Sequence, residues 1–215
     1  MHVIIHFNVF VYFLVKLFNN NLMKIIVASS NEHKVKEINE ILKGSGINAI
    51  SLKEANIDPI DVEENGTTFQ ENALIKAKAI SDVCSNYVIS DDSGLVVHAL
   101  NGFPGIKTAR FASECGGYDN AMEKLNLMLK DKCKDAHFEC VICLIKKNEE
   151  PRFFLGRVDG EIIEPIKGDN GFGYDPCFKP CGYDQPFSKL DKEIKNSISH
   201  RYRALKLLKD FLSAA

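Results

Sequence analysis

From residue 23 onward, short apolar runs alternate with segments of helical periodicity. The run at 24–28 has the length of a buried strand, and the polar cluster that follows it is a good helix N-cap. Apolar residues then recur at helical spacing over 35–42, until Gly44 ends the pattern. The same alternation continues toward the C-terminus and predicts an α/β protein with a mixed sheet.

The other elements are predicted in the same way. Thr67 or Thr68 is expected to cap one helix and Ser199 the last one. A glycine- and proline-rich turn is expected at 102–105, and a hairpin turn at 148–151. The expected strands are 24–28, 47–52, 87–90, 95–97, 136–146 and 152–162, and the expected helices cover 35–42, 69–84, 118–130 and 200–212.

Length and charge limit the class of protein. At 215 residues the chain is large enough to bury a full core, and we expect residues 23–215 to form one domain. It is 45% hydrophobic and 26% charged, which is ordinary for a globular protein. The formal net charge is -2 and the basic residues are spread among acids, so nucleic acid is not expected as a partner.

The chain has seven cysteines, an odd number, and is longer than small disulfide scaffolds. We therefore expect free thiols in a reducing compartment, the cytoplasm. Cys140 and Cys143 have the spacing of a zinc or redox motif, but they lie in an expected strand. Residues three apart on a strand point to opposite faces, so these two sulfurs are not expected to share a metal or a disulfide.

The first 22 residues differ from the rest of the chain. They contain an apolar run at 9–15, without the basic start and small-residue cleavage site of a secretory signal. The apolar stretch also falls slightly short of the roughly 20 residues of a membrane span. We expect Met23 to be the true start and residues 1–22 not to belong to the native protein. The alternative is a membrane anchor.

Two adjacent carboxylates, Asp91 and Asp92, directly follow the apolar run at 87–89 and precede Ser93 and Gly94. An apolar strand that ends in two carboxylates and then turns is a common way to hold a divalent metal at a cleft. Mg²⁺ prefers hard oxygen ligands of this kind. The alternative is purely structural, because aspartates at strand ends also cap helices and form Asx-turns.

Polar side chains also gather at the start of two helices. Ser29, Asn31 and Lys34 lie at a helix N-terminus, where exposed N–H groups and the helix dipole favour anions. Plain helix capping is the alternative. Glu63 and Glu64 precede the helix expected at 69–84 and offer further oxygen ligands, unless they are an ordinary solvated pair.

Two C-terminal motifs complete the set. The segment 171–176 is a glycine-hinged loop with two aromatic rings and a carboxylate, which suits base stacking as well as ordinary turn packing. Lys195, His200 and Arg201 place three potential cations around the start of the last helix, where a solvated basic helix end is the alternative. Together, the motifs are the parts of a nucleoside triphosphate site.

At this point a family resemblance is plain. The chain resembles the inosine triphosphate pyrophosphatases, also called the noncanonical purine (dITP/XTP) pyrophosphatases or the Ham1/RdgB family. The resemblance runs in family order from Met23 nearly to the C-terminus. It implies an elongated α/β protein of two lobes around an active-site cleft, usually a homodimer. The matching blocks are SSNEHK, EENGTTFQENALIKAKA, SDDSGLVVHALNGFPGIKTARFA, GFGYDPCF and SISHRYRALKLL.

The resemblance also implies roles for residues at the phosphate end of the cleft. Glu64 and Asp92 match metal-binding acids, with Asp91 beside them, and Asp92 also matches the proposed general base. Ser93 matches a substrate contact. The residues that match phosphate-side contacts are Ser29, Asn31, Lys34 and Lys76.

At the base end, the resemblance places Arg201 and His200 near the purine, where Arg201 would donate to the carbonyl at position 6. The alternative is that Arg201 grips phosphate. Lys195 matches a further nucleotide contact and is expected to help Lys34 stabilise the leaving pyrophosphate. The residues that match the base-binding loop are Phe172, Gly173, Tyr174 and Asp175.

The implied reaction is Mg²⁺-dependent hydrolysis of ITP, dITP or XTP to the monophosphate and pyrophosphate. Two other functions are weighed against it. A Maf-type nucleotide pyrophosphatase would share the architecture and prefer other bases. A nucleotide-binding module without turnover would not need a general base beside a metal.

Overall fold

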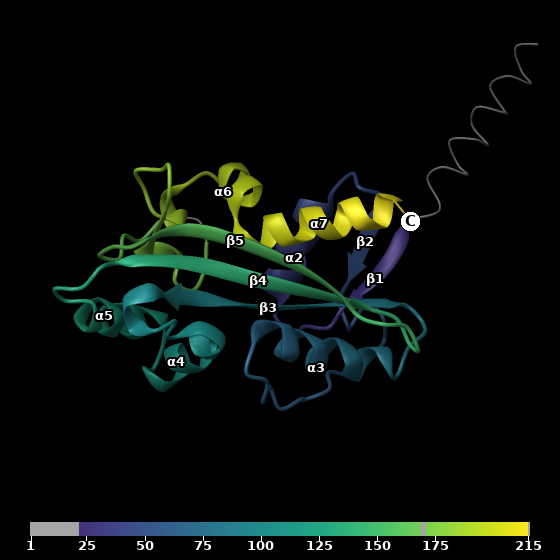
Figure 1. The fold of residues 1–215 in the computed structure, drawn as a ribbon. Helices are drawn as coiled ribbons and strands as arrows, with labels where there is room; N and C mark the ends of the chain where they lie inside the picture. The colour runs from purple at the N-terminus through teal and green to yellow at the C-terminus, as the bar shows by residue number, and fades with distance from the viewer. Residues whose placement is uncertain (1–21, 169–170, 215) are drawn as a thin grey trace, which may run out of the picture.

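A six-stranded mixed sheet runs the length of the molecule (Figure 1). The computed structural model describes residues 22–168 and 171–214. The strand order is β2-β1-β3-β4-β5-β6, with β1 parallel to both β2 and β3 and the remaining pairs antiparallel. The strands are β1 (Met23–Val27), β2 (Ile47–Ile50), β3 (Tyr87–Val97), β4 (Asp135–Ile145), β5 (Arg152–Ile162) and β6 (Phe178–Pro180).

Helices cover both faces of the sheet, and the predicted α/β class is confirmed. At one end of the sheet, α2 and α7 lie on one face and α3 on the other, while α4 and α5 lie at the opposite end (Figure 1). The helices are α2 (Glu32–Leu42), α3 (Phe69–Ser81), α4 (Thr108–Glu114), α5 (Tyr118–Met128), α6 (Lys192–Ile198) and α7 (His200–Ala214), with short 3-10 turns η1 (His98–Leu100), η2 (Gly105–Lys107), η3 (Asp175–Cys177) and η4 (Phe187–Lys189).

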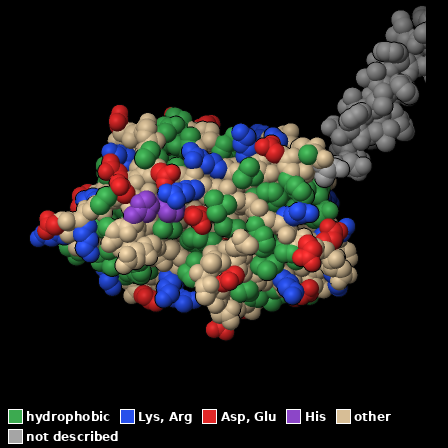
Figure 2. All heavy atoms as spheres, in the orientation of Figure 1, with side chains coloured by type: hydrophobic (Ala, Val, Ile, Leu, Met, Phe, Trp, Pro, Cys, Tyr) green, Lys and Arg blue, Asp and Glu red, His purple; other side chains and the backbone are tan. Residues whose placement is uncertain are grey.

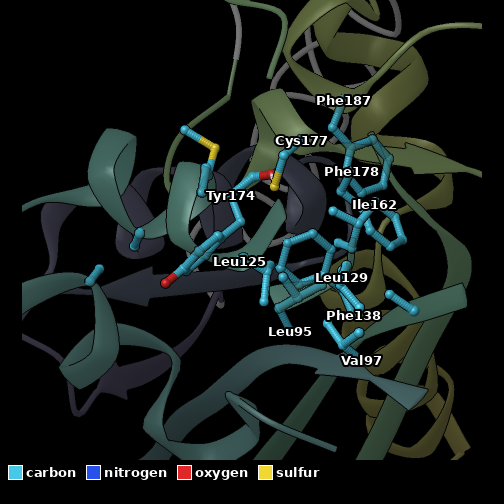
Figure 3. Close-up of a cluster of buried hydrophobic side chains, with 14 of the residues drawn as sticks. Leu95, Val97, Leu125, Leu129, Phe138, Ile162, Tyr174, Cys177, Phe178 and Phe187 are labelled. Carbon is cyan, nitrogen blue, oxygen red and sulfur yellow. Dashed lines mark hydrogen bonds between the residues drawn. The ribbon is translucent and has the colours of Figure 1, made fainter. Parts of the chain in front are cut away.

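Three buried apolar clusters divide the molecule into two lobes. Two of them sandwich the sheet between α3 on one face and α2 with α7 on the other. The third fills the opposite end, where Leu125 of α5 packs with Phe138 of β4 and with Phe178 and Phe187 near the C-terminus (Figure 3). Because β3, β4 and β5 pass through both ends, the lobes share one sheet.

The prediction that the chain turns after Asp92 is wrong. Instead, β3 continues to Val97 as one strand of 11 residues. It pairs with β4 from Val88 opposite Ile145 to Val97 opposite Ala136, and this pairing overrides the turn preference of the polar residues. Gly94 serves close packing, because a Cβ there would lie 2.4 Å from the carbonyl oxygen of Gly105.

Most of the other predicted elements are present. The hairpin of β4 and β5 and the helices near 69–84 and 118–130 are confirmed, with ends that differ by two or three residues. Cys140 and Cys143 lie in clusters on opposite faces of the sheet, as expected. The sequence patterns missed α4, α6 and β6, which are short and irregular in periodicity.

The surface and termini add little to the fold. Acidic and basic side chains are interspersed over the face shown in Figure 2. Within the described part of the chain, the helices are too short or too polar to cross a membrane. Except for Leu22, the predictions for residues 1–22 fall outside the described residues.

Gly156 allows α7 to lie directly on β5. A Cβ at this position would lie 2.0 Å from the carbonyl oxygen of His200 and 2.5 Å from the backbone nitrogen of Ala204. Both are backbone atoms of α7, so a side chain at Gly156 must push the helix off the sheet. The first residues of α7, which the sequence places in the candidate site, therefore depend on this contact.

We predict that Gly156→Ala lowers the free energy of unfolding by about 2–3 kcal/mol, because overpacking a filled contact costs this much. Urea denaturation measures the change. Leu155→Thr is the matched control, since Leu155 is half-exposed on the opposite face of the same strand; its cost should stay within about 0.5 kcal/mol. Equal stabilities of the two variants would contradict the packing argument.

Candidate functional site

A cleft lies along the free edge of β3. β1 pairs with β3 only from Tyr87 to Ile89, so the edge beyond Ile89 has no neighbouring strand. The resulting hollow is about 350 Å³ and is walled by both lobes. Its lining includes every predicted site residue except Asp92: Ser29, Asn31, Lys34, Glu64, Lys76, Asp91, Ser93, Phe172, Gly173, Tyr174, Asp175, Lys195, His200 and Arg201.

The strand geometry separates the two adjacent aspartates. Successive side chains on β3 point to opposite faces. Asp91 points toward α2 and α7, where it meets Lys34 and Arg201, whereas Asp92 points toward α3, where it meets Lys76. The pair therefore forms two different centres on the two sides of one strand edge.

On the first side, Asp91 and Arg201 form a buried ion pair. The Arg201 Nε donates to Asp91 Oδ2 at 2.8 Å, and Nη2 donates to Oδ1 at 3.3 Å. Arg201 Nη1 also donates to Glu37 Oε2 of α2 at 2.6 Å. All three side chains are buried. Burial would raise the pKa of Asp91, but Arg201 and Lys34 outweigh it and hold that pKa well below its usual range.

The remaining groups around Asp91 complete this network. Ser93 Oγ accepts from Arg201 Nη2 at 3.1 Å and donates to Asp91 Oδ1 at 3.0 Å. The Cys140 thiol donates to Asp91 Oδ2 at 3.0 Å, and burial, reinforced by Asp91, raises the pKa of this thiol well above its usual value. Of the five N–H donors of Arg201, four are used, which leaves one on Nη1 without a partner among the described residues.

Glu37 was not predicted as a site residue. One of its carboxylate oxygens holds Arg201, and the other, Oε1, is buried without a hydrogen-bond partner in the described structure. Its spacing could have indicated a place in the site, because Glu37 lies three residues after Lys34 and shares its side of α2. The sequence could not reveal its partner, which lies 164 positions away on α7.

On the second side, Lys76 joins Asp92 to Glu64. Its Nζ lies 2.5 Å from Asp92 Oδ1 and 3.1 Å from Glu64 Oε2. Burial raises the pKa of Asp92 to about 6, although Lys76 opposes this shift. Two carboxylate oxygens from separate segments thus converge on one cation. This donor set has the chemistry that Mg²⁺ requires, with room at the cleft for water and phosphate oxygens.

Ser29 and Asn31 organise the start of α2. Asn31 Oδ1 accepts from the backbone nitrogens of His33 at 3.0 Å and Lys34 at 3.3 Å, and Ser29 Oγ accepts from the backbone nitrogen of Asn31 at 3.1 Å. These bonds cap the helix, which is the structural alternative considered above for this motif. They also fix the helix N-terminus at the cleft wall, beside the Lys34 ammonium.

The aromatic loop is held by Asp175. Asp175 Oδ2 accepts from the backbone nitrogen of Phe172 at 2.6 Å and from Lys195 Nζ at 2.7 Å. Gly171 has φ 88°, and a Cβ there would lie 2.4 Å from the same carboxylate oxygen, so only glycine fits. The Lys195 ammonium lies 4.9 Å from the Phe172 ring centre, within cation–π range. Lys195 of α6 therefore packs against the aromatic loop.

His200 is not one of the three cations expected here. It is buried and stacks on Phe138 with 4.9 Å between ring centres. Burial, and next the charge of Arg201, lower the pKa of His200 well below its usual value. The imidazole is therefore neutral. A further lining residue, Tyr118 of α5, was missed by the sequence patterns; its ring packs edge-on to Tyr174 at 5.3 Å.

Comparison with known proteins agrees with this architecture. The model of the Ham1 family matches residues 25–211. A dITP/XTP pyrophosphatase of Clostridium perfringens is 46% identical over 198 residues, which cover 88% of this chain and 97% of that protein. A dITP/XTP pyrophosphatase of Oceanobacillus iheyensis is 42% identical over 192 residues, with 88% and 98% covered.

Solved structures give the same result for the fold. The Staphylococcus aureus Ham1 protein superimposes with a TM-score of 0.79 at 41% identity, covering 89% of this chain and 98% of that one. A HAM1 protein from Coxiella burnetii also gives 0.79, at 36% identity, with 90% and 100% covered. The predicted family resemblance and fold are both confirmed.

We predict that Arg201→Ala destabilises the fold by about 3–5 kcal/mol, because it leaves the buried carboxylates of Asp91 and Glu37 without their shared cation. Chemical denaturation of the purified variant measures the loss. Lys206→Ala, an exposed position on the same helix, is the control and should change little. A loss at Arg201 no larger than the control's would show that this network does not stabilise the fold.

Proposed function

The chain belongs to the Ham1 family, and from this membership we propose that it hydrolyses ITP, dITP and XTP to the nucleoside monophosphate and pyrophosphate. One observation carries the proposal. A single cleft is lined at one end by two lysines, Lys34 and Lys76, each paired with an aspartate of β3, and at the other by a cation-backed aromatic loop. The first end suits a metal-bound triphosphate and the second a purine base.

Glu64 and Asp92 are the residues that would hold Mg²⁺. Their convergence on one cation supports this assignment. When bound there, the ion supplies Lewis-acid polarisation and neutralises charge that develops on the phosphate oxygens. Asp91 fits a ligand role less well, because both of its oxygens already hold Arg201. We assign Asp91 to anchoring Arg201.

Asp92 is assigned to orient and deprotonate the attacking water. The water oxygen would bond to the α-phosphorus, the bond to the α,β-bridging oxygen would break, and pyrophosphate would leave. A carboxylate whose pKa is raised toward neutrality is a better proton acceptor than an ordinary aspartate. Its contact with Lys76 supports the proposal, because a lysine there would be available to the reacting phosphates.

The phosphate chain is assigned to Ser29, Asn31, Lys34 and Lys76. Lys34 and Lys76 each reach the cleft, and the α2 N-terminus adds a favourable dipole. Such fixed positive groups lower the barrier of phosphoryl transfer by stabilising the transition state and the leaving group. We reassign Lys195 from the leaving pyrophosphate to the base end, because it pairs with Asp175 beneath Phe172.

Base recognition is assigned to the aromatic loop and Arg201. Phe172 would stack on the purine, while the remaining Nη1 donor of Arg201 would meet the carbonyl at position 6. Adenine carries an amino group there, so a donor would face a donor. Mismatched buried polar groups of this kind discriminate by about 10⁴ or more.

We propose that the protein is a cytoplasmic homodimer and that residues 23–215 of each copy form one domain. The seven cysteines form no disulfide, which suits a reducing compartment. The shared sheet supports a single folding unit. The homodimer rests on the family resemblance, and sedimentation velocity at micromolar concentration tests it.

Asp92→Asn should lower kcat for ITP by at least about 10²–10³ while the fold survives, because the variant loses both a ligand and a base. Pyrophosphate release in the presence of Mg²⁺ is the assay, and it also separates the proposed enzyme from a binding module without turnover. Asp82→Asn, an exposed position at the end of α3, should leave the rate unchanged. A rate within tenfold of wild type would exclude Asp92 from both roles.

Arg201→Lys retains a charge for Asp91 and Glu37 but removes the planar fork that presents the free donor. We expect kcat/KM for ITP to fall by at least about 10², with little change in residual ATP hydrolysis, so that the preference shrinks. ITP and ATP are measured side by side, with Arg203→Lys as control. Similar losses on both substrates would instead assign Arg201 to the phosphates.

A further inference from the structure

Lys76 occupies the point between the two carboxylates to which a metal ion is assigned above. Its Nζ is within 3.1 Å of both Glu64 Oε2 and Asp92 Oδ1, and its side chain is mostly buried. An ammonium at hydrogen-bond distance from two carboxylates is charged at neutral pH. The Lys76 ammonium therefore already occupies the position that the metal ion would need.

Two cations cannot share this point. A divalent ion between the same two oxygens would repel an ammonium at hydrogen-bond distance from both. Lys76 has a flexible four-carbon stem and lines the cleft beside the phosphate-binding N-terminus of α2, so a place on the phosphates is within its reach. Its departure must be coupled to the arrival of another positive charge.

Lys34 differs from Lys76 in this respect. It also pairs with a buried carboxylate, Asp91, but Asp91 is held by Arg201 as well. If Lys34 moves to a phosphate, Asp91 keeps a counter-charge. If Lys76 moves, Asp92 and the exposed Glu64 lose their ion-pair partner among the described residues. For Asp92, which is buried, an uncompensated charge is strongly unfavourable.

We propose that Lys76 is a placeholder cation, which neutralises Glu64 and Asp92 in the free protein and moves to the substrate phosphates when a divalent metal ion takes its position. This inference rests on the metal site of the proposed function. It implies that the free protein binds divalent ions weakly. It also implies that metal and nucleotide raise each other's affinity. The metal ion releases Lys76 to bind phosphate, and a bound phosphate draws Lys76 away from the metal position.

The test measures Mn²⁺ binding by electron paramagnetic resonance at pH 8, without nucleotide and without turnover. Lys76→Met should bind Mn²⁺ at least about tenfold more tightly than wild type, because the competing charge is gone. Lys76→Arg keeps the charge and should bind as weakly as wild type. Lys78→Met is the matched control, because Lys78 is exposed on the same helix; it should also resemble wild type.

Two further variants keep the result interpretable. Lys76→Gln removes the charge but retains a hydrogen-bonding group, and it replaces Lys76→Met if thermal melting shows that the latter is unfolded. Adding Asp92→Asn to the Lys76 variant should abolish the gained affinity. Equal Mn²⁺ affinity in wild type and the neutral Lys76 variants, lost in both when Asp92 is changed, would overturn the placeholder and leave the metal site standing. Binding that ignores Asp92 throughout would overturn the metal site itself.

Discussion

The buried contact of Arg201 with Asp91 and Glu37 is the interaction on which the site depends. It ties the first turn of α7 to β3 and to α2, three segments that are far apart in the sequence. Burying these charges is tolerable only because nearly every donor and acceptor is used. The same contact fixes Arg201 at the cleft wall. The side chain that stabilises this contact is thus also the one for which base recognition is proposed, so a substitution there would affect both.

The edge of β3 explains how one short motif forms two charge centres on opposite sides of the strand. Since β1 stops beside Ile89, the next residues of β3 are reachable from both faces of the sheet. Asp91 and Ser93 then serve the Arg201 side, and Asp92 serves the Lys76 side. Period-two alternation converts adjacent residues into two separate charge centres.

Much of the architecture could be predicted from the sequence because it depends on local periodicity. Apolar spacing identified β1, α2 and the β4–β5 hairpin. Polar motifs at helix starts, at a strand end and in a glycine loop identified part of the cleft lining, whereas Lys76 and the role of Ser93 came only from the family resemblance. The sequence could not show that β3 continues through Asp92, since pairing with β4 imposes this and the partner of Asp92 there, Val141, lies far along the chain. It also could not show that Glu37 holds Arg201 or that His200 is neutral, because both follow from burial in the folded protein.

The roles proposed for Asp92 and the lysines require that water attacks the α-phosphorus of a purine triphosphate held in this cleft. Hydrolysis of ITP in ¹⁸O-labelled water, followed by mass spectrometry of both products, measures this in one experiment. Attack at the α-phosphorus places one ¹⁸O in inosine monophosphate and none in pyrophosphate, which is the result that we predict. Label in the pyrophosphate, or release of orthophosphate with a diphosphate, would contradict the roles assigned to Asp92 and to the lysines of the phosphate end.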